Sequence, residues 1–379
     1  KRYLNFQIIF IYIAVDRVLI GVADNFFSSW VLFIIAAIII CAQFKKSLWL
    51  FLLMKGAYMK IVVDSKIKIS IFKMLFAFFI ILNVGLLAIS YYFYNIIMTY
   101  SHTNAYTISD YQKEAKELGY DYSSLNAAER EYVVIESDYG YKLKGLFIKN
   151  PMETKKTIIL VHGIGRDKDW SIMKYGPLFF KNGFNIFAYD SRDHGGSGGK
   201  YPTYGFYESN DLDKCIKYVK NKKIDGVIAL HGESMGASVS LLWAGKYDNA
   251  GVSFLVEDCG YSDLYDLYYE RLSDYKIPKF IRPVILYYTS FLCKILAGFS
   301  LSDVSPIKNV GKIVMPVLFI HGNADNFVRP EMAKEMFNSK IGLKNIYFAP
   351  EAGHAKSINI DVNQYEKAIT DFCNDVIKR

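Results

Sequence analysis

The sequence predicts an α/β protein: a doubly wound, mostly parallel sheet of eight strands with a helical lid, preceded by an N-terminal transmembrane helix or helices. Three observations predict it. From residue 132 onward, apolar runs of strand length alternate with amphipathic stretches of helical length. The run 74–99 contains no charged residue. The insert 261–311 interrupts this alternation, and its sequence has a helical pattern and is rich in tyrosine and aliphatic residues.

Length and composition indicate one large domain plus an apolar region. The chain has 379 residues, more than a single hydrophobic core usually supports. Apolar residues make up 52% of the chain and charged residues 22%, and the apolar excess lies in the first hundred residues. The net charge of +8 does not indicate a nucleic-acid partner, because the lysines gather only around the apolar segments.

The cysteines suggest neither a disulfide framework nor a metal site. Their number, five, is odd, and they form no C-x-x-C pair and no zinc-type pattern with histidine. We therefore expect free, buried cysteines and no metal or cofactor. The five positions are Cys41, Cys215, Cys259, Cys293 and Cys373.

The uncharged run 74–99 is long enough to cross a hydrocarbon core of about 30 Å. A tyrosine cluster at 91–94 lies near one end of the run, where a membrane interface is expected. We therefore expect a transmembrane helix here. Two upstream runs, 5–22 and 26–44, are candidates for further spans, although two charged residues interrupt the first.

Charge predicts the orientation of this helix. The segment between residues 44 and 74 carries seven lysines and one acidic residue, Asp64, so the positive-inside rule places it in the cytoplasm. Everything after residue 100 then lies on the extracytoplasmic side of the cell membrane. The chain opens on lysine, and the four residues before Met59 could be encoded by a ribosome-binding site, so we hypothesise that Met59 is the natural start.

The chain is expected to divide into four parts: an apolar and basic N-terminal region (1–73), the membrane helix (74–99), a polar linker (100–131) with a short helix around 108–118, and an α/β domain (132–379). The first two strands of the domain should form a hairpin, and the others should be parallel. The expected strands are 133–137, 141–148, 157–163, 184–190, 227–232, 252–258, 317–322 and 345–350.

The pentapeptide Gly232-Glu233-Ser234-Met235-Gly236 fits the motif G-x-S-x-G. It directly follows an apolar strand, and a helix-like run of small residues follows it. This strand, turn and helix context is what the motif requires, because a tight, strained turn projects the serine hydroxyl from the sheet edge. Ser234 is therefore a candidate nucleophile.

A nucleophilic serine needs a base, because its hydroxyl is protonated at neutral pH. Of the six histidines, only His354 follows both Ser234 and a plausible acid in the order serine, acid, histidine. The expected acid is Asp325, after the seventh strand, and Asp258, at the end of the sixth, is its competitor. Three other histidines, each at a strand end before glycine, are expected to make structural hydrogen bonds: His162, His231 and His321.

Two backbone amides are candidate oxyanion donors. Met235 begins the helix after Ser234, so its N–H should point toward the same space as the serine hydroxyl. Ile164 lies in the glycine-flanked loop 162–165 after the third strand, where no large neighbouring side chain obstructs its N–H.

These motifs resemble the α/β-hydrolase superfamily, and within it the Bem46-like and serine-aminopeptidase-like hydrolases that carry an N-terminal membrane anchor. The matching text is DYGYKLKG, LVHGIGRD, AYDSRDHGGSGG, HGESMGAS, HGNADNFV and EAGHAKS, in family order over about residues 130–379. The lid 261–311 and the first 58 residues depart from the family pattern. The resemblance implies a nucleophile, acid and base at Ser234, Asp325 and His354, and oxyanion amides at Ile164 and Met235.

The resemblance implies a serine hydrolase in the membrane that acts on a small-molecule acyl ester through an acyl-serine intermediate, without metal or cofactor. Two alternatives stay open: a peptidase or amidase of the same fold, and a catalytically silent membrane-bound binding module. The oligomeric state is also open. Candidate substrate contacts are Trp170, Tyr261 and Tyr265, for which packing is an equal reading.

Overall fold

The structure is a computed structural model, and it describes residues 65–103, 106–222, 226–247 and 251–377. The predicted upstream spans 5–22 and 26–44 and the hypothetical start at Met59 lie outside the described residues. The chain divides into two compact units, Lys1–Ala77 and Phe78–Arg379. The sheet, the lid and the candidate site all belong to the second unit.

Helix α3, Ser65–Thr103, extends beyond both ends of the uncharged run that predicted it. Among the described residues, its segment Lys73–Tyr100 is the one unbroken helix that is long and apolar enough to cross a membrane. Most of its side chains up to Tyr92 are exposed. From Phe93 onward, one side of the helix is buried in the core of the α/β domain, so the helix and the domain share hydrophobic packing.

The segment predicted as a linker contains two short helices, α4 (Ile108–Glu117) and α5 (Ser123–Asn126). Thr107 and Asp110 form a reciprocal capping box that starts α4, which satisfies backbone N–H groups that a helix start otherwise leaves without partners. Helix α4 packs on the domain, and its residue Tyr111 contacts the ring of Trp170.

Eight strands form one sheet in the order β1-β2-β4-β3-β5-β6-β7-β8. Strand β2 is antiparallel to both of its neighbours, and all the other neighbouring pairs are parallel. Every apolar run predicted as a strand forms one. The bounds are β1 Arg130–Glu136, β2 Lys142–Ile148, β3 Lys156–Val161, β4 Asn185–Tyr189, β5 Val227–Glu233, β6 Phe254–Asp258, β7 Val317–Gly322 and β8 Lys344–Ala349.

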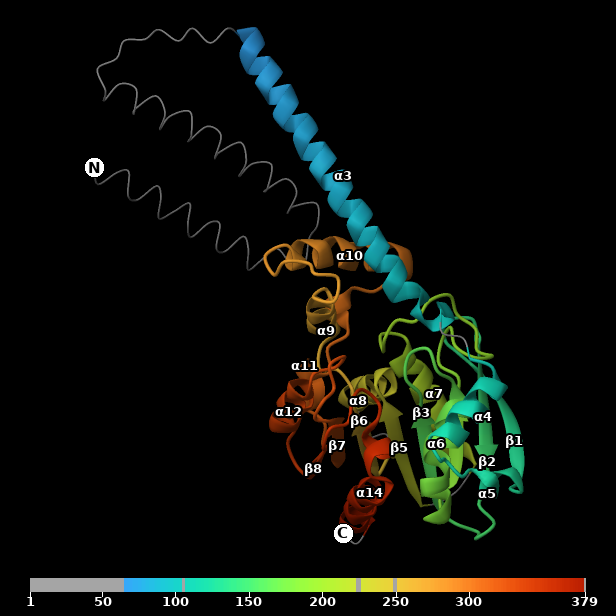
Figure 1. The fold of residues 1–379 in the computed structure, drawn as a ribbon. Helices are drawn as coiled ribbons and strands as arrows, with labels where there is room; N and C mark the ends of the chain where they lie inside the picture. Colours follow the sequence, from blue (N-terminus) through green and yellow to red (C-terminus); the bar gives the residue numbers. More distant parts are fainter. Residues whose placement is uncertain (1–64, 104–105, 223–225, 248–250, 378–379) are drawn as a thin grey trace. The chain divides into compact units, whose positions relative to one another are not determined.

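Helices cover both faces of the sheet, which gives the predicted doubly wound architecture (Figure 1). One core cluster joins the sheet to α6 and α14, and the other joins it to α7, α8 and α12. The central parallel strands are apolar on both faces because both faces are covered. The helix bounds are α6 Lys168–Lys181, α7 Glu208–Asn221, α8 Met235–Tyr247, α12 Pro330–Ser339, α13 Ser357–Ile360 and α14 Val362–Ile377.

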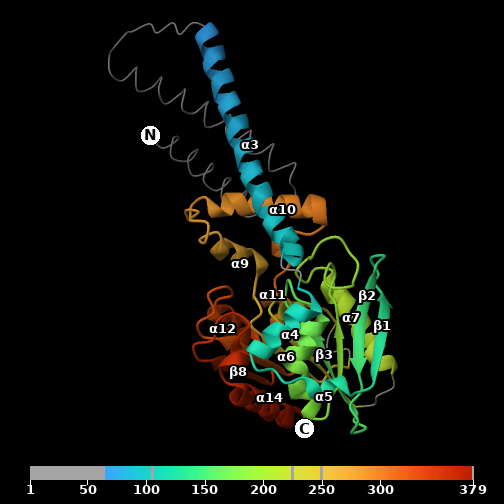
Figure 2. The same cartoon turned by 45° about the vertical axis from the view of Figure 1, so that its right-hand side comes forward.

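The insert between β6 and β7 is helical, as predicted. It begins at the carboxyl end of β6, the edge of the sheet where open α/β folds bind ligands. Figure 2 shows its helices α9 and α10 beyond this edge. The core cluster that joins the sheet to α7, α8 and α12 extends into the insert through buried residues of α10. The bounds are α9 Leu264–Arg271, α10 Arg282–Ala297, the 3-10 turn Leu301–Asp303 and α11 Ile307–Val310.

Candidate active site

Ser234 lies in the sharp turn between β5 and α8. Its φ of 53° is in the left-handed region, a strained conformation for a residue other than glycine. The turn is so tight that both flanking positions must be glycine. A Cβ on Gly232 would lie 2.4 Å from the carbonyl oxygen of Gly236, and a Cβ on Gly236 would lie 2.1 Å from that of Val161. The backbone N–H of Ser234 donates to the Asp258 carbonyl at 2.8 Å, which ties the turn to β6.

His354 joins the serine to the acid. Its Nε2 lies 2.8 Å from Ser234 Oγ, and its Nδ1 lies 2.7 Å from Asp325 Oδ2. The histidine comes from the turn between β8 and α13, and Asp325 comes from the loop after β7. Since adjacent parallel strands end at the same edge of the sheet, these loops meet although Ser234 and His354 are 120 residues apart. The structure therefore brings together all three residues predicted from the sequence.

The Asp325 carboxylate is buried and fully hydrogen-bonded. Its Oδ1 accepts the backbone N–H groups of Phe327 and Val328 at 2.8 and 2.9 Å. Burial by itself raises the pKa of this carboxyl, but hydrogen bonds from His321 and His354 outweigh it and hold the pKa below its ordinary value. Asp325 is therefore an anion that can orient an imidazole and stabilise its charged form.

His321 is a contact of Asp325 that sequence reasoning did not assign to the site. Its Nε2 lies 2.9 Å from the carbonyl oxygen of Val328 and 3.3 Å from Asp325 Oδ2. Burial lowers the pKa of this imidazole, yet the hydrogen bond to Asp325 raises it above its ordinary value overall. The prediction of a structural hydrogen bond is confirmed, and the histidine also supports the acid. Only the H-G pair at the strand end signalled its position.

The other two strand-end histidines make structural hydrogen bonds, as predicted. His162 Nε2 accepts the backbone N–H of Ser191 at 2.8 Å, and His231 Nε2 lies 2.8 Å from the hydroxyl of Tyr365. Burial lowers the pKa of His231 to about 3, so its imidazole is neutral. His162 therefore holds the loop after β4, and His231 joins β5 to α14.

Asp258, the competing acid, faces a different set of groups. Its Oδ2 accepts hydroxyl hydrogen bonds from Tyr365 at 2.8 Å and Tyr175 at 3.3 Å. Burial raises the pKa of this carboxyl to about 6. The geometry therefore favours Asp325 as the partner of His354, and Asp258 is a buried structural acid.

A buried ion pair lies next to the turn that holds Ser234, and the sequence did not reveal it. Glu233, the residue before the serine, bonds the Lys174 ammonium and accepts the Tyr175 hydroxyl at 2.5 Å. Lys174 also donates to the carbonyl of Ala355 at 2.6 Å. Burial opposes both charges, yet their mutual attraction lowers the pKa of Glu233 and raises that of Lys174. The pair therefore connects the serine turn with the histidine loop.

A small cavity lies directly at Ser234. Its volume is about 20 Å³, room for little more than one water molecule, so an acyl group can enter only if side chains move. None of the described residues that line it is charged. The lining residues are Tyr100, Ile164, Tyr204, Ser234, Met235, Tyr261, Leu267, Tyr268 and Phe327.

The remaining predicted site residues lie at different distances from this cavity. Ile164 and Met235, the predicted oxyanion residues, both line it beside Ser234, and so does Tyr261. Tyr265 does not line it. Trp170 lies elsewhere, buried with Met173 and α4, with the Arg166 guanidinium 4.5 Å from its ring centroid. Trp170 therefore packs against α4 and does not line this cavity. The lid residues at the cavity are Tyr261 and, from α9, Leu267 and Tyr268.

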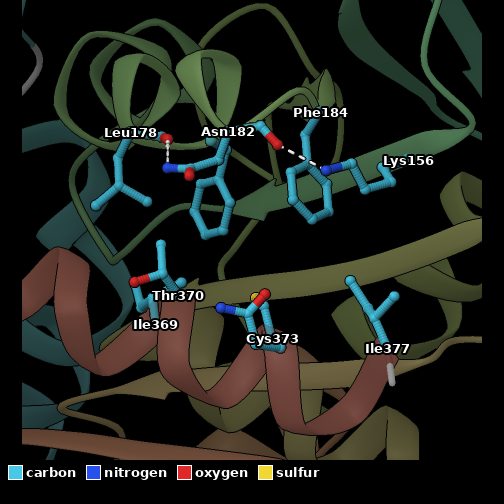
Figure 3. A pocket seen from close by; sticks show the side chains of 10 residues that line it. Lys156, Leu178, Asn182, Phe184, Ile369, Thr370, Cys373 and Ile377 are labelled. Atoms are coloured by element: carbon cyan, nitrogen blue, oxygen red, sulfur yellow. Dashed lines mark hydrogen bonds between the residues drawn. The ribbon is translucent and has the colours of Figure 1, made fainter. Parts of the chain in front are cut away.

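A second cavity, of about 100 Å³, lies between α6 and α14 (Figure 3). Apolar side chains such as Leu178 and Ile369 line it, and the Lys156 ammonium there donates to the Asn182 carbonyl at 2.7 Å. Ser234, His354 and Asp325 are absent from its lining. It is a gap in helix packing with no nucleophile and base pair among its described residues.

One group of described side chains could approach a metal ion: Cys259, Asp325 and His354, whose ligand atoms lie within 4.8 Å of one another. The set fits a metal poorly, because Asp325 and His354 already bond each other. In addition, burial raises the pKa of the Cys259 thiol well above its ordinary value, whereas a metal ligand must be a thiolate. The four described cysteines are all free and buried.

Comparison with protein families and curated proteins gives two kinds of match. A family described as serine aminopeptidase, S33, matches residues 152–256. YqkD of Bacillus subtilis, an uncharacterised protein, is 35% identical over 273 residues, which cover 71% of this chain and 88% of YqkD. YfhR of Escherichia coli K12, also uncharacterised, is 24% identical over 64% of this chain and 80% of its own length.

Similar solved structures share this fold, and they include an esterase. The Pyrococcus furiosus esterase Pf2001 superposes with a TM-score of 0.55 at 22% identity, over 69% of this chain and 94% of that one. Est1E of Butyrivibrio proteoclasticus, solved with ferulic acid, has a TM-score of 0.51 at 15% identity, over 65% and 100%. At these identities the likeness concerns the fold.

Proposed function

The chain belongs to the α/β-hydrolase superfamily, and from this premise we propose that it is a membrane-anchored serine hydrolase that cleaves carboxylic esters. The observation that carries the proposal is the hydrogen-bonded series from Ser234 Oγ through His354 to Asp325, with distances of 2.8 and 2.7 Å. Within this superfamily, membership of the Bem46-like group stays a prediction.

In the proposed reaction, His354 accepts the Ser234 hydroxyl proton as the serine oxygen attacks the ester carbonyl. The tetrahedral intermediate then collapses, His354 returns the proton to the leaving alcohol, and an acyl-serine remains. Water, deprotonated by His354, then attacks the acyl-serine, and as this second tetrahedral intermediate collapses His354 returns the proton to Ser234 Oγ and the acid is released. Asp325 stabilises the imidazolium at each step, because its depressed pKa keeps it ionised.

The proposed oxyanion donors are the backbone N–H groups of Ile164 and Met235. Both residues line the cavity at Ser234. The loop of Ile164 approaches the serine closely, since a Cβ on Gly163 would lie 3.4 Å from Ser234 Cβ. Removing one donor of this kind typically costs about 3 kcal/mol in the activation barrier.

An ester is favoured over an aminopeptidase substrate by the cavity lining. An aminopeptidase holds the free ammonium of its substrate, and a buried ammonium is costly without a paired acid. The described residues around the cavity are aromatic or aliphatic apart from Ser234 and Met235, and none is acidic. The peptidase alternative rests on the description of the matched family.

Two measurements test the catalytic proposal. A fluorophosphonate should label the wild-type protein and fail to label Ser234→Ala. Equal labelling of both would contradict the role of Ser234, and labelling of neither would favour the silent binding module. A panel of acyl esters against aminoacyl amides should show higher kcat/KM for the esters, and a preference for the amides would instead support the peptidase.

The membrane anchor is proposed from α3, whose segment Lys73–Tyr100 is apolar, largely exposed and long enough to span. The lysine-rich sequence before residue 74 supports an extracytoplasmic catalytic domain. In intact spheroplasts, a membrane-impermeant maleimide should label Glu136→Cys, which lies on the exposed hairpin. Labelling only after lysis would reverse the proposed orientation.

A further inference from the structure

Helix α10 of the lid carries large apolar side chains on its exposed side as well as on its buried side, and the exposed side also holds Lys294, which pairs with Asp303 at 3.4 Å. Its inward side, with Ile285, Leu286 and Cys293, is buried in the core. Its outward side is exposed, and no described residue covers it. A contiguous set of exposed apolar side chains marks a surface that contacts another protein or a membrane. We call this exposed set the outer face of α10: Phe280 just before the helix (83% exposed), Val284 (36%), Tyr287 (47%), Ile295 (62%) and Leu296 (48%).

Helix α10 crosses α3 within the apolar stretch of α3. Ser90 Oγ donates to the carbonyl of Ile285 at 3.1 Å, and Thr289 Oγ1 donates to the carbonyl of Ser90 at 3.3 Å. The Tyr288 hydroxyl bonds the Asn83 side chain. Figures 1 and 2 show α10 lying across α3 in both views. Polar side chains thus fix the lid helix to the proposed membrane helix.

The level of this crossing matches a membrane boundary. A hydrocarbon core of about 30 Å takes about 20 helical residues. Counted from Lys73, that length ends near Tyr92, where the side chains of α3 change from exposed to buried in the domain. The contacts at Asn83 and Ser90 fall in the outer part of this stretch. At 1.5 Å per residue these contacts lie roughly 3 and 14 Å inside the boundary at Tyr92, a range that includes the 5–10 Å to which an interfacial helix buries its apolar face.

The surroundings of the outer face suit lipid headgroups. Lys276 and Lys279 are exposed in the turn that leads into α10, where they can attract anionic headgroups. The exposed rings of Tyr275 and Tyr287 have the amphipathic character that favours the interface between membrane and water.

We propose that the outer face of α10 is seated in the interfacial layer of the same bilayer that α3 crosses, so that the lid rests on lipid. The inference rests on the proposed function, and in particular on the proposed anchor. It also narrows the substrate class. The cavity at Ser234 is lined by Tyr100 of α3 and by Leu267 and Tyr268 of the lid, so it is closed by the helix that enters the membrane and by the lid that rests on it. The expected substrates are esters that partition into the bilayer.

Depth-dependent fluorescence quenching tests the seating. The full chain is reconstituted into phosphatidylcholine and phosphatidylglycerol vesicles with an environment-sensitive fluorophore on Ile295→Cys. The matched control is Ile341→Cys, since Ile341 is the same residue type, 58% exposed, and lies at the opposite edge of the sheet, before β8. Nitroxide lipids should quench the label at 295 at least about twofold more than the label at 341. The unsubstituted protein, labelled in parallel, gives the background.

A third label, on Leu82→Cys of α3, separates failure of the inference from failure of the anchor. Quenching at 82 without quenching at 295 would overturn the seating of α10 and leave the anchor intact. A blue-shifted label at 295 that nitroxide lipids do not quench would do the same, because protein would then cover the face. Absence of quenching at 82 would overturn the anchor and, with it, this inference.

Hydrolysis gives an independent readout. The double variant Ile295→Glu/Leu296→Glu should hydrolyse a short water-soluble ester at the wild-type rate. Its rate on a long-chain ester dissolved in the vesicles should fall about fivefold or more, because the lid no longer rests in the interface. Ile341→Glu should keep both rates. Equal loss on both esters, or loss on neither, would contradict the proposed substrate class.

Discussion

Lys174 donates a 2.6 Å hydrogen bond to the backbone carbonyl of Ala355, the residue that follows the proposed base. The same ammonium pairs with Glu233, the residue before the proposed nucleophile. One buried side chain on α6 therefore touches both loops that must meet for Ser234 and His354 to bond. Its role is to position them, since it does not contact the reacting atoms.

Replacing Lys174 by methionine should destabilise the protein by about 3–5 kcal/mol, because the Glu233 carboxylate would stay buried without its partner. Activity should fall as well, since the His354 loop loses its tether. The double variant Lys174→Met/Glu233→Gln should regain much of the stability. Lys181→Met, on the same helix, removes an exposed pair with Glu366 and should cost less than about 1 kcal/mol. Denaturant unfolding in detergent measures all four proteins, and equal effects at 174 and 181 would contradict the prediction.

Glu257 gives the protein a predictable pH dependence. Burial raises the pKa of this carboxyl to about 8, so the folded protein keeps a proton that the unfolded chain releases. The stability from this neutral carboxyl is complete below the unfolded pKa of about 4.5 and is lost as the pH rises through the folded value of about 8. The slope is up to about 1.4 kcal/mol per pH unit.

Glu257→Gln stays neutral at every pH, so its stability relative to wild type should rise between pH 5 and pH 8. Unfolding midpoints at the two pH values measure the difference. Glu331→Gln, which changes an exposed carboxyl on α12, serves as the control and should show no such trend. A constant offset between Glu257→Gln and wild type would mean that the carboxyl is already ionised at pH 5.

The two candidate acids can be separated by isosteric replacement. Asp325→Asn should lower kcat by about 10⁴-fold, because an amide stabilises the wrong tautomer of His354 and no longer stabilises its charged form. Asp258→Asn should lower kcat by less than about tenfold, since its partners are the Tyr365 and Tyr175 hydroxyls. Thermal melts check that both variants fold. A larger loss at 258 than at 325 would make Asp258 the acid.

Much of the fold and the candidate site was predictable because the signals are local. Each parallel strand is a short apolar run that is buried on both faces, and the elbow at Ser234 needs its two glycines within five residues of sequence. The order of Ser234, Asp325 and His354 follows from the strand order. Such features can be recognised within one short segment of the chain or from the order of such segments along it.

The remainder depends on contacts between distant segments. Lys174 and Glu233 are 59 residues apart, and Ser90 and Ile285 are 195 apart, so neither pair leaves a local pattern. The sequence around Trp170 is equally compatible with a tryptophan that lines a cavity and with one that packs on Tyr111, as it does here. Helix α3 is longer than predicted because the prediction followed the uncharged run, whereas the helix continues into the charged residues before 74 and the polar residues after 99.

The cavity at Ser234 is closed by side chains of α9, so acyl length should respond to their size. Leu267 lines the cavity, and Leu267→Ala should raise the kcat/KM ratio of octanoyl to acetyl esters by about tenfold, since a few methylene groups of space are worth about 1–3 kcal/mol. Leu272, just after α9, is also buried but does not line the cavity. Leu272→Ala should therefore lower stability by about 2–5 kcal/mol and leave the ratio unchanged. If both variants shift the ratio alike, the preference for acyl length depends on general loosening of the lid and not on the size of the side chain at Leu267.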